Sequence, residues 1–162
     1  MDTDSEDEDI RLIPQSNVLS EILPGKLYLT DRKVANDLLK LQQHDIKGIV
    51  SLGTMEDQST YKVFLTEFEY HWIYIDDEPT ESMYYHFEDA IEFIDETEGA
   101  IVVHCYAGIS RSTTIVAAYL IAKQNMTVDE AMNFIKSKRS FVCPNYGFIK
   151  DLNDFYNIFF NV

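Results

Sequence analysis

Short apolar runs alternate with longer amphipathic stretches along the chain, which is the pattern of strands that alternate with helices. Apolar runs predict four strands, at residues 27–29, 48–52, 70–75 and 100–104, the last as a central buried strand. Apolar positions at helical spacing predict six helices, over residues 31–43, 59–68, 84–94, 113–123, 127–135 and 146–158. This alternation predicts an α/β fold built in layers, with helices on both faces of a sheet.

Polar residues near the predicted helix starts support these limits. Asp31 and Ser82 are candidate N-caps, and residues 127–130 (TVDE) have the spacing of a capping box. Asn145 is a candidate cap of the last helix. The stretch 113–123 is nearly all apolar, which predicts a helix enclosed by the rest of the protein.

The composition is that of a folded domain with an acidic tail. Hydrophobic residues make up 46% of the 162 residues and charged residues 25%, and this length fits one domain. We expect a flexible tail at residues 1–15 and a single domain over residues 16–162. The first ten residues contribute -6 to the formal net charge of -15, and both a solubilising and a regulatory tail remain open.

The acidic excess argues against nucleic acid as a partner, because binding to phosphates needs a basic surface and only 13 Lys and Arg stand against 28 Asp and Glu. An anionic membrane would repel the chain for the same reason. The sequence shows no bilayer-spanning run and no signal peptide, so we expect a cytoplasmic protein, with the nucleus as an alternative. Two cysteines and four scattered histidines form no disulfide framework or zinc pattern, so we expect no metal and no cofactor.

The stretch VHCYAGISRS, residues 103–112, carries the candidate chemistry because it joins the predicted central strand to the enclosed helix. Open α/β folds bind ligands at this position, outside the carboxyl ends of the strands. Gly108 permits a backbone conformation that a side chain would disfavour, so amides of the turn can converge on an anion. Arg111 offers a planar, permanently charged fork for two phosphate oxygens.

The same surroundings favour the thiolate form of Cys105, because a helix N-terminus and an arginine both stabilise a negative charge. Such a thiolate can attack phosphorus in line and form a phosphocysteine intermediate. Ser112 can donate a hydrogen bond to the sulfur as it leaves, and His104 is expected to orient the loop. The non-functional alternatives are a buried structural thiol at Cys105 and a surface ion pair at Arg111.

The spacing Cys105-x5-Arg111, preceded by His104 and followed by Ser112, resembles the signature of cysteine-dependent protein tyrosine phosphatases. The longer form HCYAGISRS resembles their dual-specificity branch, as do the flanking stretches SEILPGKLYL and AMNFIKSKRSFVCPNYGFIKDL. The short chain is similar to the small, atypical members of that branch. The resemblance implies a single-domain, three-layer phosphatase fold with a mixed, mostly parallel sheet of about five strands and helices on both faces.

The resemblance also implies site roles beyond the signature. The pattern Tyr-x-x-Ile-x-Ile-x-Asp assigns the general acid to Asp77, with Asp76 and Glu78 as competitors. The phosphate-binding loop is implied to comprise Tyr106, Ala107, Gly108, Ile109, Ser110 and Arg111. Asn145 is implied to brace this loop. We interpret Cys143 as structural filler, and a disulfide that protects an oxidised nucleophile is the alternative.

The variable loop positions, which hold no basic residue, favour one substrate class. Relatives that act on inositol lipids tend to carry lysines there, so their absence and the negative charge favour phosphoproteins. The compact chain leaves little room for loops that deepen the pocket, so we expect action on phosphotyrosine and on phosphoserine and phosphothreonine, in substrates with basic neighbours. The alternatives are a phosphoinositide or other non-protein phosphatase and a non-catalytic phosphate-binding module. Expected partners are phosphorylated proteins, with kinases as candidates, and the protein is expected to be a monomer.

Overall fold

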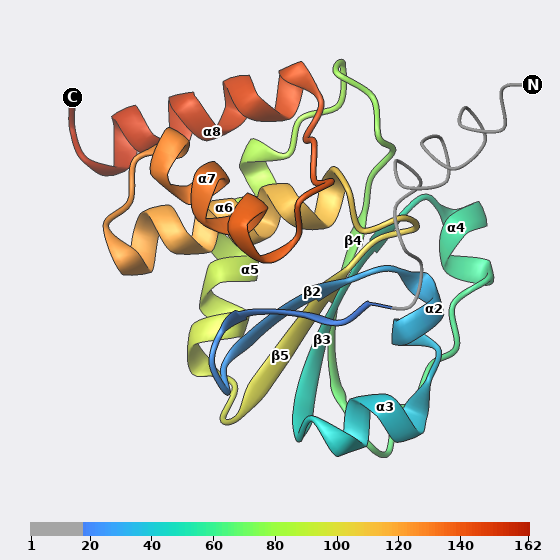
Figure 1. The fold of residues 1–162 in the computed structure, drawn as a ribbon. Helices are drawn as coiled ribbons and strands as arrows, with labels where there is room; N and C mark the ends of the chain where they lie inside the picture. Colours follow the sequence, from blue (N-terminus) through green and yellow to red (C-terminus); the bar gives the residue numbers. More distant parts are fainter. Residues whose placement is uncertain (1–17) are drawn as a thin grey trace, which may run out of the picture.

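The computed structural model describes residues 18–162, so the predicted acidic tail lies outside the described residues. Five strands form one sheet in the order β1-β2-β5-β3-β4 (Figure 1). The strands are β1 (Ser20–Leu23), β2 (Leu27–Thr30), β3 (Ile46–Gly53), β4 (Glu69–Tyr74) and β5 (Ala100–His104). β1 pairs antiparallel with β2 and the other neighbours pair in parallel, which confirms the expected mixed, mostly parallel sheet.

Helices cover both faces of this sheet, as expected for three layers (Figure 1). They are α2 (Arg32–Ala35), α3 (Leu38–Gln43), α4 (Met55–Ser59), α5 (Tyr84–Glu96), α6 (Arg111–Gln124), α7 (Val128–Lys138) and α8 (Tyr146–Phe159). Helices α5 to α8 pack on one face in a large core, and α2 and α3 pack on the other in a smaller one. No helix in residues 18–162 is long and apolar enough to cross a membrane.

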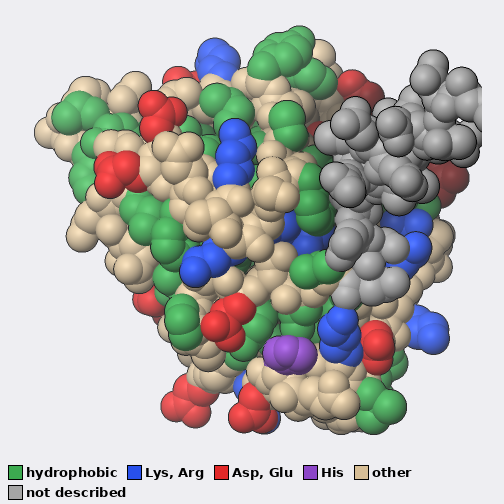
Figure 2. All heavy atoms as spheres, in the orientation of Figure 1, with side chains coloured by type: hydrophobic (Ala, Val, Ile, Leu, Met, Phe, Trp, Pro, Cys, Tyr) green, Lys and Arg blue, Asp and Glu red, His purple; other side chains and the backbone are tan. Residues whose placement is uncertain are grey.

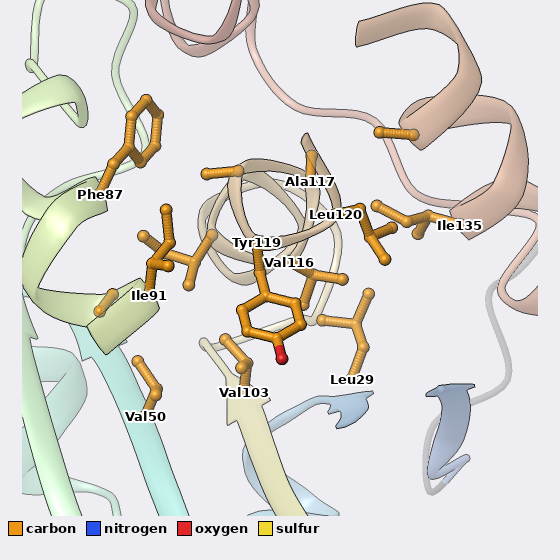
Figure 3. Packing of buried hydrophobic residues seen from close by; sticks show 14 of the residues in the cluster. Leu29, Val50, Phe87, Ile91, Val103, Val116, Ala117, Tyr119, Leu120 and Ile135 are labelled. Atoms are coloured by element: carbon orange, nitrogen blue, oxygen red, sulfur yellow. The ribbon is translucent and has the colours of Figure 1, made fainter. Parts of the chain in front are cut away.

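The central strand β5 contributes to both cores, because successive side chains of a strand point to opposite faces. Val102 packs in the smaller core with Val34 of α2, whereas Val103 packs in the larger one. Figure 3 shows α6 at the centre of the larger core, between Ile91 of α5 and Ile135 of α7. Residues 111–121 of α6 are all buried, so the prediction of an enclosed helix is confirmed.

The prediction of a single helix over residues 31–43 was wrong, because the structure has two short helices there. Asp31 caps α2 as predicted and accepts hydrogen bonds from the amides of Lys33 and Val34. Asp37 then adopts an extended conformation, and its side chain accepts a hydrogen bond from the amide of Lys40. A second N-cap inside the apolar pattern therefore divides the helix.

The prediction of a helix over residues 59–68 was also wrong. Helix α4 lies earlier, because Thr54 and Asp57 form a reciprocal capping box that starts a helix at Met55. Residues 60–68 lie outside the helices, and Leu65 is exposed. The apolar spacing in this stretch therefore marks no buried helical face.

Ser82 does not cap the helix that follows it. The N-cap of α5 is Met83, which has no side-chain capping bond. Its amide donates instead to Asp151 Oδ2 of α8, at 2.9 Å. A distant carboxylate therefore satisfies the amide at this helix start. The capping box of Thr127 and the Asn145 cap are both confirmed.

Candidate active site

Cys105 lies directly after β5, and the loop that follows ends where α6 begins at Arg111. The cysteine is buried, with 2% of its surface exposed. The amide of Gly108 donates to its Sγ at 3.3 Å, and Ser112 Oγ lies 3.1 Å from the same sulfur. The loop therefore bends back over the sulfur, and two hydrogen-bonding groups meet there.

Gly108 is required by the shape of this loop. Its φ is +66°, and a Cβ at this position would lie 2.6 Å from Thr30 O and 2.6 Å from Arg139 Nη2. The left-handed backbone and the close approach of strand β2 both exclude a side chain here.

Three carbonyl groups of the loop are held from its outer side. Tyr106 O accepts from the amide and Nη1 of Arg32, Gly108 O accepts from Arg139 Nε, and Ile109 O accepts from the amide of Cys143. In a trans peptide the carbonyl and the next amide point in opposite directions. The amides after these carbonyls therefore point away from the outer contacts, as needed for an anion cradle.

Arg111 is buried at the start of α6 and is held by a side chain of α4 and a carbonyl just after β4. Its Nη1 donates to Asp57 Oδ2 at 2.7 Å and to the carbonyl of Ile75 at 3.1 Å. Both of these side-chain bonds to described residues use Nη1, which leaves Nε and Nη2 for phosphate oxygens. The guanidinium therefore has a fixed orientation before any ligand binds.

Asp57 is a site residue that the sequence reasoning missed. Burial alone would raise the pKa of its carboxyl, but hydrogen bonds from Arg111 and Thr54 outweigh burial and hold that pKa below its usual value. Burial likewise opposes the charge of Arg111, but Asp57 and Cys105 raise the pKa of the guanidinium above its usual value. The pair is therefore charged throughout the neutral range. The T-x-x-D capping pattern at residues 54–57 could have placed Asp57 at a helix start, but not beside Arg111.

The predicted general acid, Asp77, lies in the loop after β4. Its Oδ1 accepts a hydrogen bond from Asn145 Nδ2 at 2.9 Å, and the amide of Asn145 donates to Ser110 Oγ at 3.0 Å. Asn145 therefore connects two loops. One is the loop between β4 and α5 that holds Asp77, called the acid loop, and the other is the loop between β5 and α6 that starts at Cys105, called the cysteine loop. The competitor Asp76 accepts from the amide of Asp77 instead, and Glu78 is exposed.

His104 supports the loop from beneath. Its Nδ1 lies 3.2 Å from the carbonyl oxygen of Cys105, and its ring meets the edge of the Tyr61 ring at 4.7 Å between centroids. Burial lowers the pKa of His104 from 6.5 to about 4, so the ring is neutral at physiological pH. Tyr61, which donates to Leu52 O, was not identified from the sequence, where no motif marks it.

The outer rim of the loop is more exposed. Tyr106 has 40% of its surface exposed, and the guanidinium carbon of Arg32 lies 3.6 Å from its ring centroid. Ala107 is exposed and Ile109 is half-buried. Cys143 is exposed, so its interpretation as structural filler was wrong; its backbone amide donates to Ile109 O of the loop. In residues 18–162, no group of three or more His, Cys, Asp or Glu side chains is placed to hold a metal ion.

Comparisons with known proteins place this geometry in a family context. The family model described as "Dual specificity phosphatase, catalytic domain" matches residues 27–158. A probable rhodanese domain-containing dual specificity protein phosphatase from Dictyostelium discoideum is 38% identical over 140 residues, which is 84% of this chain and 28% of that protein. Dual specificity protein phosphatase 1 from Arabidopsis thaliana is 34% identical over 147 residues, covering 89% of this chain and 72% of that protein.

A solved structure gives a match of similar extent. The human tyrosine phosphatase-like serine/threonine/tyrosine-interacting protein superposes with a TM-score of 0.84 and 32% identity, over 88% of this chain and 97% of that one. The chain spans 28% to 35% of the length of several curated relatives that it matches.

Proposed function

The chain belongs to the family of dual specificity phosphatase catalytic domains, and from this premise we propose that it hydrolyses phosphotyrosine, phosphoserine and phosphothreonine in proteins through a phosphocysteine intermediate. One observation carries the proposal. A buried cysteine sulfur is met by the amide of Gly108 and the hydroxyl of Ser112, at the base of a loop that ends in the oriented guanidinium of Arg111.

The first step transfers the phosphoryl group to the enzyme. The Cys105 thiolate attacks phosphorus, the S–P bond forms, and the P–O bond to the substrate side chain breaks. Asp77 gives its proton to the departing oxygen. Arg111 and the loop amides bind the equatorial oxygens, whose charge they stabilise more strongly in the transition state.

The second step releases phosphate. A water molecule attacks phosphorus and gives its proton to the Asp77 carboxylate, while the S–P bond breaks and the thiolate returns. Ser112 Oγ, at 3.1 Å from Sγ, donates a hydrogen bond to the sulfur as negative charge develops on it. The two steps together consume one water molecule and restore the enzyme.

A binding function without catalysis is the competing proposal, because one similar protein is named as phosphatase-like and interacting. Retention of Cys105, together with the contacts of Ser112 with its sulfur and of Asn145 with Asp77, favours catalysis in this chain. A phosphate-binding module needs the cradle but has no need of a nucleophile or a proton donor.

The test is turnover of three substrates by the full chain: a phosphotyrosine peptide, a phosphothreonine peptide and a soluble inositol lipid. We expect hydrolysis of both peptides without added metal, and its loss in Cys105→Ser. Asp77→Asn should slow the phosphothreonine peptide most, because an alkoxide leaving group needs the proton more than a phenoxide does.

Glu78→Gln, which alters an exposed neighbour in the same loop, is the matched control and should hydrolyse both peptides normally. Hydrolysis of the inositol lipid alone would overturn the substrate class. Binding of phosphopeptides with no turnover by the wild-type chain would overturn the enzyme assignment itself.

A further inference from the structure

Arg139, the residue that follows helix α7, is a buried cation that contacts the cysteine loop through Gly108. Only 2% of its surface is exposed. Burial of a guanidinium is unfavourable unless hydrogen bonds and opposite charges compensate for its lost hydration. What surrounds Arg139 therefore indicates why it is there.

Its guanidinium joins two parts of the chain that are more than 80 residues apart. Nε donates to Gly108 O at 2.9 Å, and Nη1 donates to Val18 O at 3.0 Å and to Ser20 Oγ at 3.1 Å. The guanidinium carbon lies 4.5 Å from the ring centroid of Phe141, which covers one face of the cation. The loop, strand β1 and the end of α7 therefore meet at one side chain.

The contact with Gly108 orients the cradle. Because Arg139 holds the Gly108 carbonyl on the outer side of the loop, the next amide, that of Ile109, must point to the opposite side. The amide of Gly108 itself already reaches Cys105 Sγ. Nη2 of Arg139 is buried against Gly108 and has no hydrogen-bond partner among the described residues, so this edge of the cation faces the loop without a hydrogen-bonded acceptor.

We infer that Arg139 is a positioning residue of the phosphate loop, which fixes the Gly108 carbonyl from behind and places a second positive charge behind the Cys105 thiolate. This inference deepens the proposed phosphocysteine chemistry and rests on it. It assigns Arg139 no contact with substrate. It predicts that the loop has two arginines with separate tasks: Arg111 binds phosphate from the front, and Arg139 shapes and polarises the loop from behind.

The electrostatics agree with this geometry. Burial lowers the pKa of Arg139 from its usual value, while the negative charges of Asp31 and Cys105 act in the opposite direction. Coulombic attraction is mutual, so the guanidinium favours the thiolate as much as the thiolate favours the guanidinium. Among the described residues, Arg111 and Tyr61 also interact electrostatically with Cys105, and His104 beside it is neutral.

The experiment separates shape from charge with two substitutions. Arg139→Met removes the charge and all three hydrogen bonds, and Arg139→Lys keeps a charge without the planar fork. Ser20→Ala is the matched control, because it removes one hydrogen bond of Arg139 that does not reach the loop. The two readouts are the pH dependence of Cys105 alkylation by iodoacetamide and the affinity for vanadate.

For Arg139→Met we expect the alkylation midpoint to rise by about one pH unit and vanadate affinity to fall about tenfold, as for the loss of one close charge. Arg139→Lys should restore much of the midpoint but not the vanadate affinity, since an ammonium cannot hold the loop with the same geometry. Ser20→Ala should match the wild type in both. If Arg139→Met does not fold, the Lys variant still decides, through the split between its two readouts.

A wild-type midpoint and wild-type vanadate affinity in either Arg139 variant would overturn the inference. So would equal losses in Ser20→Ala, which would show general destabilisation. Neither readout requires turnover. If the wild-type chain binds vanadate and is alkylated at Cys105 but hydrolyses no phosphopeptide, the proposed function fails while the role of Arg139 stands.

Discussion

At the scale of single residues, the site is held by polar side chains that lie outside the signature. The loop holds Cys105 and Arg111, the proposed nucleophile and phosphate-binding residue, but Asp57 orients that arginine and Asn145 contacts Asp77, the proposed acid. Each of these partners is itself fixed at a helix N-terminus, Asp57 in a capping box and Asn145 as an N-cap. Both residues therefore combine a helix-capping role with a contact to a residue of the site.

Substitution of Asp57 tests this arrangement. We expect Asp57→Ala to weaken vanadate binding about tenfold, because Arg111 loses its strongest anchor and must be ordered by the ligand. Asp57→Asn, which keeps an acceptor oxygen, should have a smaller effect. The lowered pKa of Asp57 means that its charge is lost only as the pH falls through that depressed value, so the effect should not change between pH 6 and 8.

Thr54→Ala is the control for Asp57, because it breaks the same capping box and leaves the Arg111 contact in place. It should cost about 1 kcal/mol of stability with vanadate affinity unchanged. Equal vanadate affinities in Asp57→Ala and wild type, measured by inhibition or calorimetry, would contradict the orienting role.

The neutral His104 gives the fold a specific pH dependence. Its pKa is about 4 in the folded protein and 6.5 in the unfolded chain, so the unfolded chain binds the proton first as the pH falls. The wild type should therefore lose stability below about pH 6.5, relative to a chain without this group, by about 1.4 kcal/mol per pH unit until about pH 4. Urea unfolding of wild type and His104→Gln at pH 7.5, 6 and 5 measures this.

Only the difference between the two proteins is informative here, because carboxyl groups titrate in both. The stability advantage of the wild type over His104→Gln should shrink as the pH falls. An advantage that stays constant across the three pH values would show that His104 is not buried in its neutral form.

The signature and its spacing predicted Cys105, Arg111, Ser112 and the loop between them, because all of these are close in sequence. Asp57 lies 54 residues before Arg111, in a chain with 28 acidic residues, and no local pattern distinguishes it from the others. Arg139 lies 31 residues after Gly108 and stands among surface lysines. Such long-range pairing depends on how the strands and helices pack, which spacing alone does not reveal.

At the scale of elements, helix α8 positions the acid loop. Its cap Asn145 contacts Asp77, and Asp151 in its second turn accepts the amide of Met83 at the end of that loop. Between them Gly147 lies so close to Pro79 that a Cβ would collide with the Pro79 carbonyl. The start of α8 and the acid loop therefore form one packed unit.

We expect Gly147→Ala to displace the acid loop. An alanine in place of glycine in a helix usually stabilises it by about 1 kcal/mol, so a fall in melting temperature would show that the close contact dominates. Hydrolysis of a phosphothreonine peptide should slow more than that of an activated aryl phosphate, which needs less help from the acid. Asn157→Ala, an exposed position on the same helix, should leave both rates unchanged. A faster or equal rate in Gly147→Ala would contradict this packing.

Element type was predicted well where burial imposed a strong pattern. The central strand was recognised because it is buried on both faces, and helices α6 to α8 were recognised because their apolar positions face the larger core. The failures at residues 31–43 and 59–68 lie in short segments near the smaller core, where Asp37 and Thr54 set the helix starts. Capping by a side chain overrides a weak apolar pattern in helices this short.

At the scale of the whole molecule, the parallel sheet brings the site together. The carboxyl ends of β3, β4 and β5 lead into α4, the acid loop and the cysteine loop, so three distant segments meet at one edge. Acidic side chains are spread over the face in Figure 2 and are interrupted by basic ones, without forming one continuous patch. Of the net charge of -15, residues 11–162 carry -9, and on this face the charge acts on a substrate as a diffuse field.

This field should select for positively charged sequence around the phosphorylated residue. At low ionic strength, kcat/KM should be higher for a phosphotyrosine peptide with lysines on both sides than for the same peptide with glutamates. Salt screens exposed charges beyond about 3 Å at 1 M, so the ratio should approach one there, while p-nitrophenyl phosphate controls for direct effects of salt on the site. Preference for the glutamate peptide would instead indicate that Arg32, beside Tyr106 at the rim, governs recognition locally.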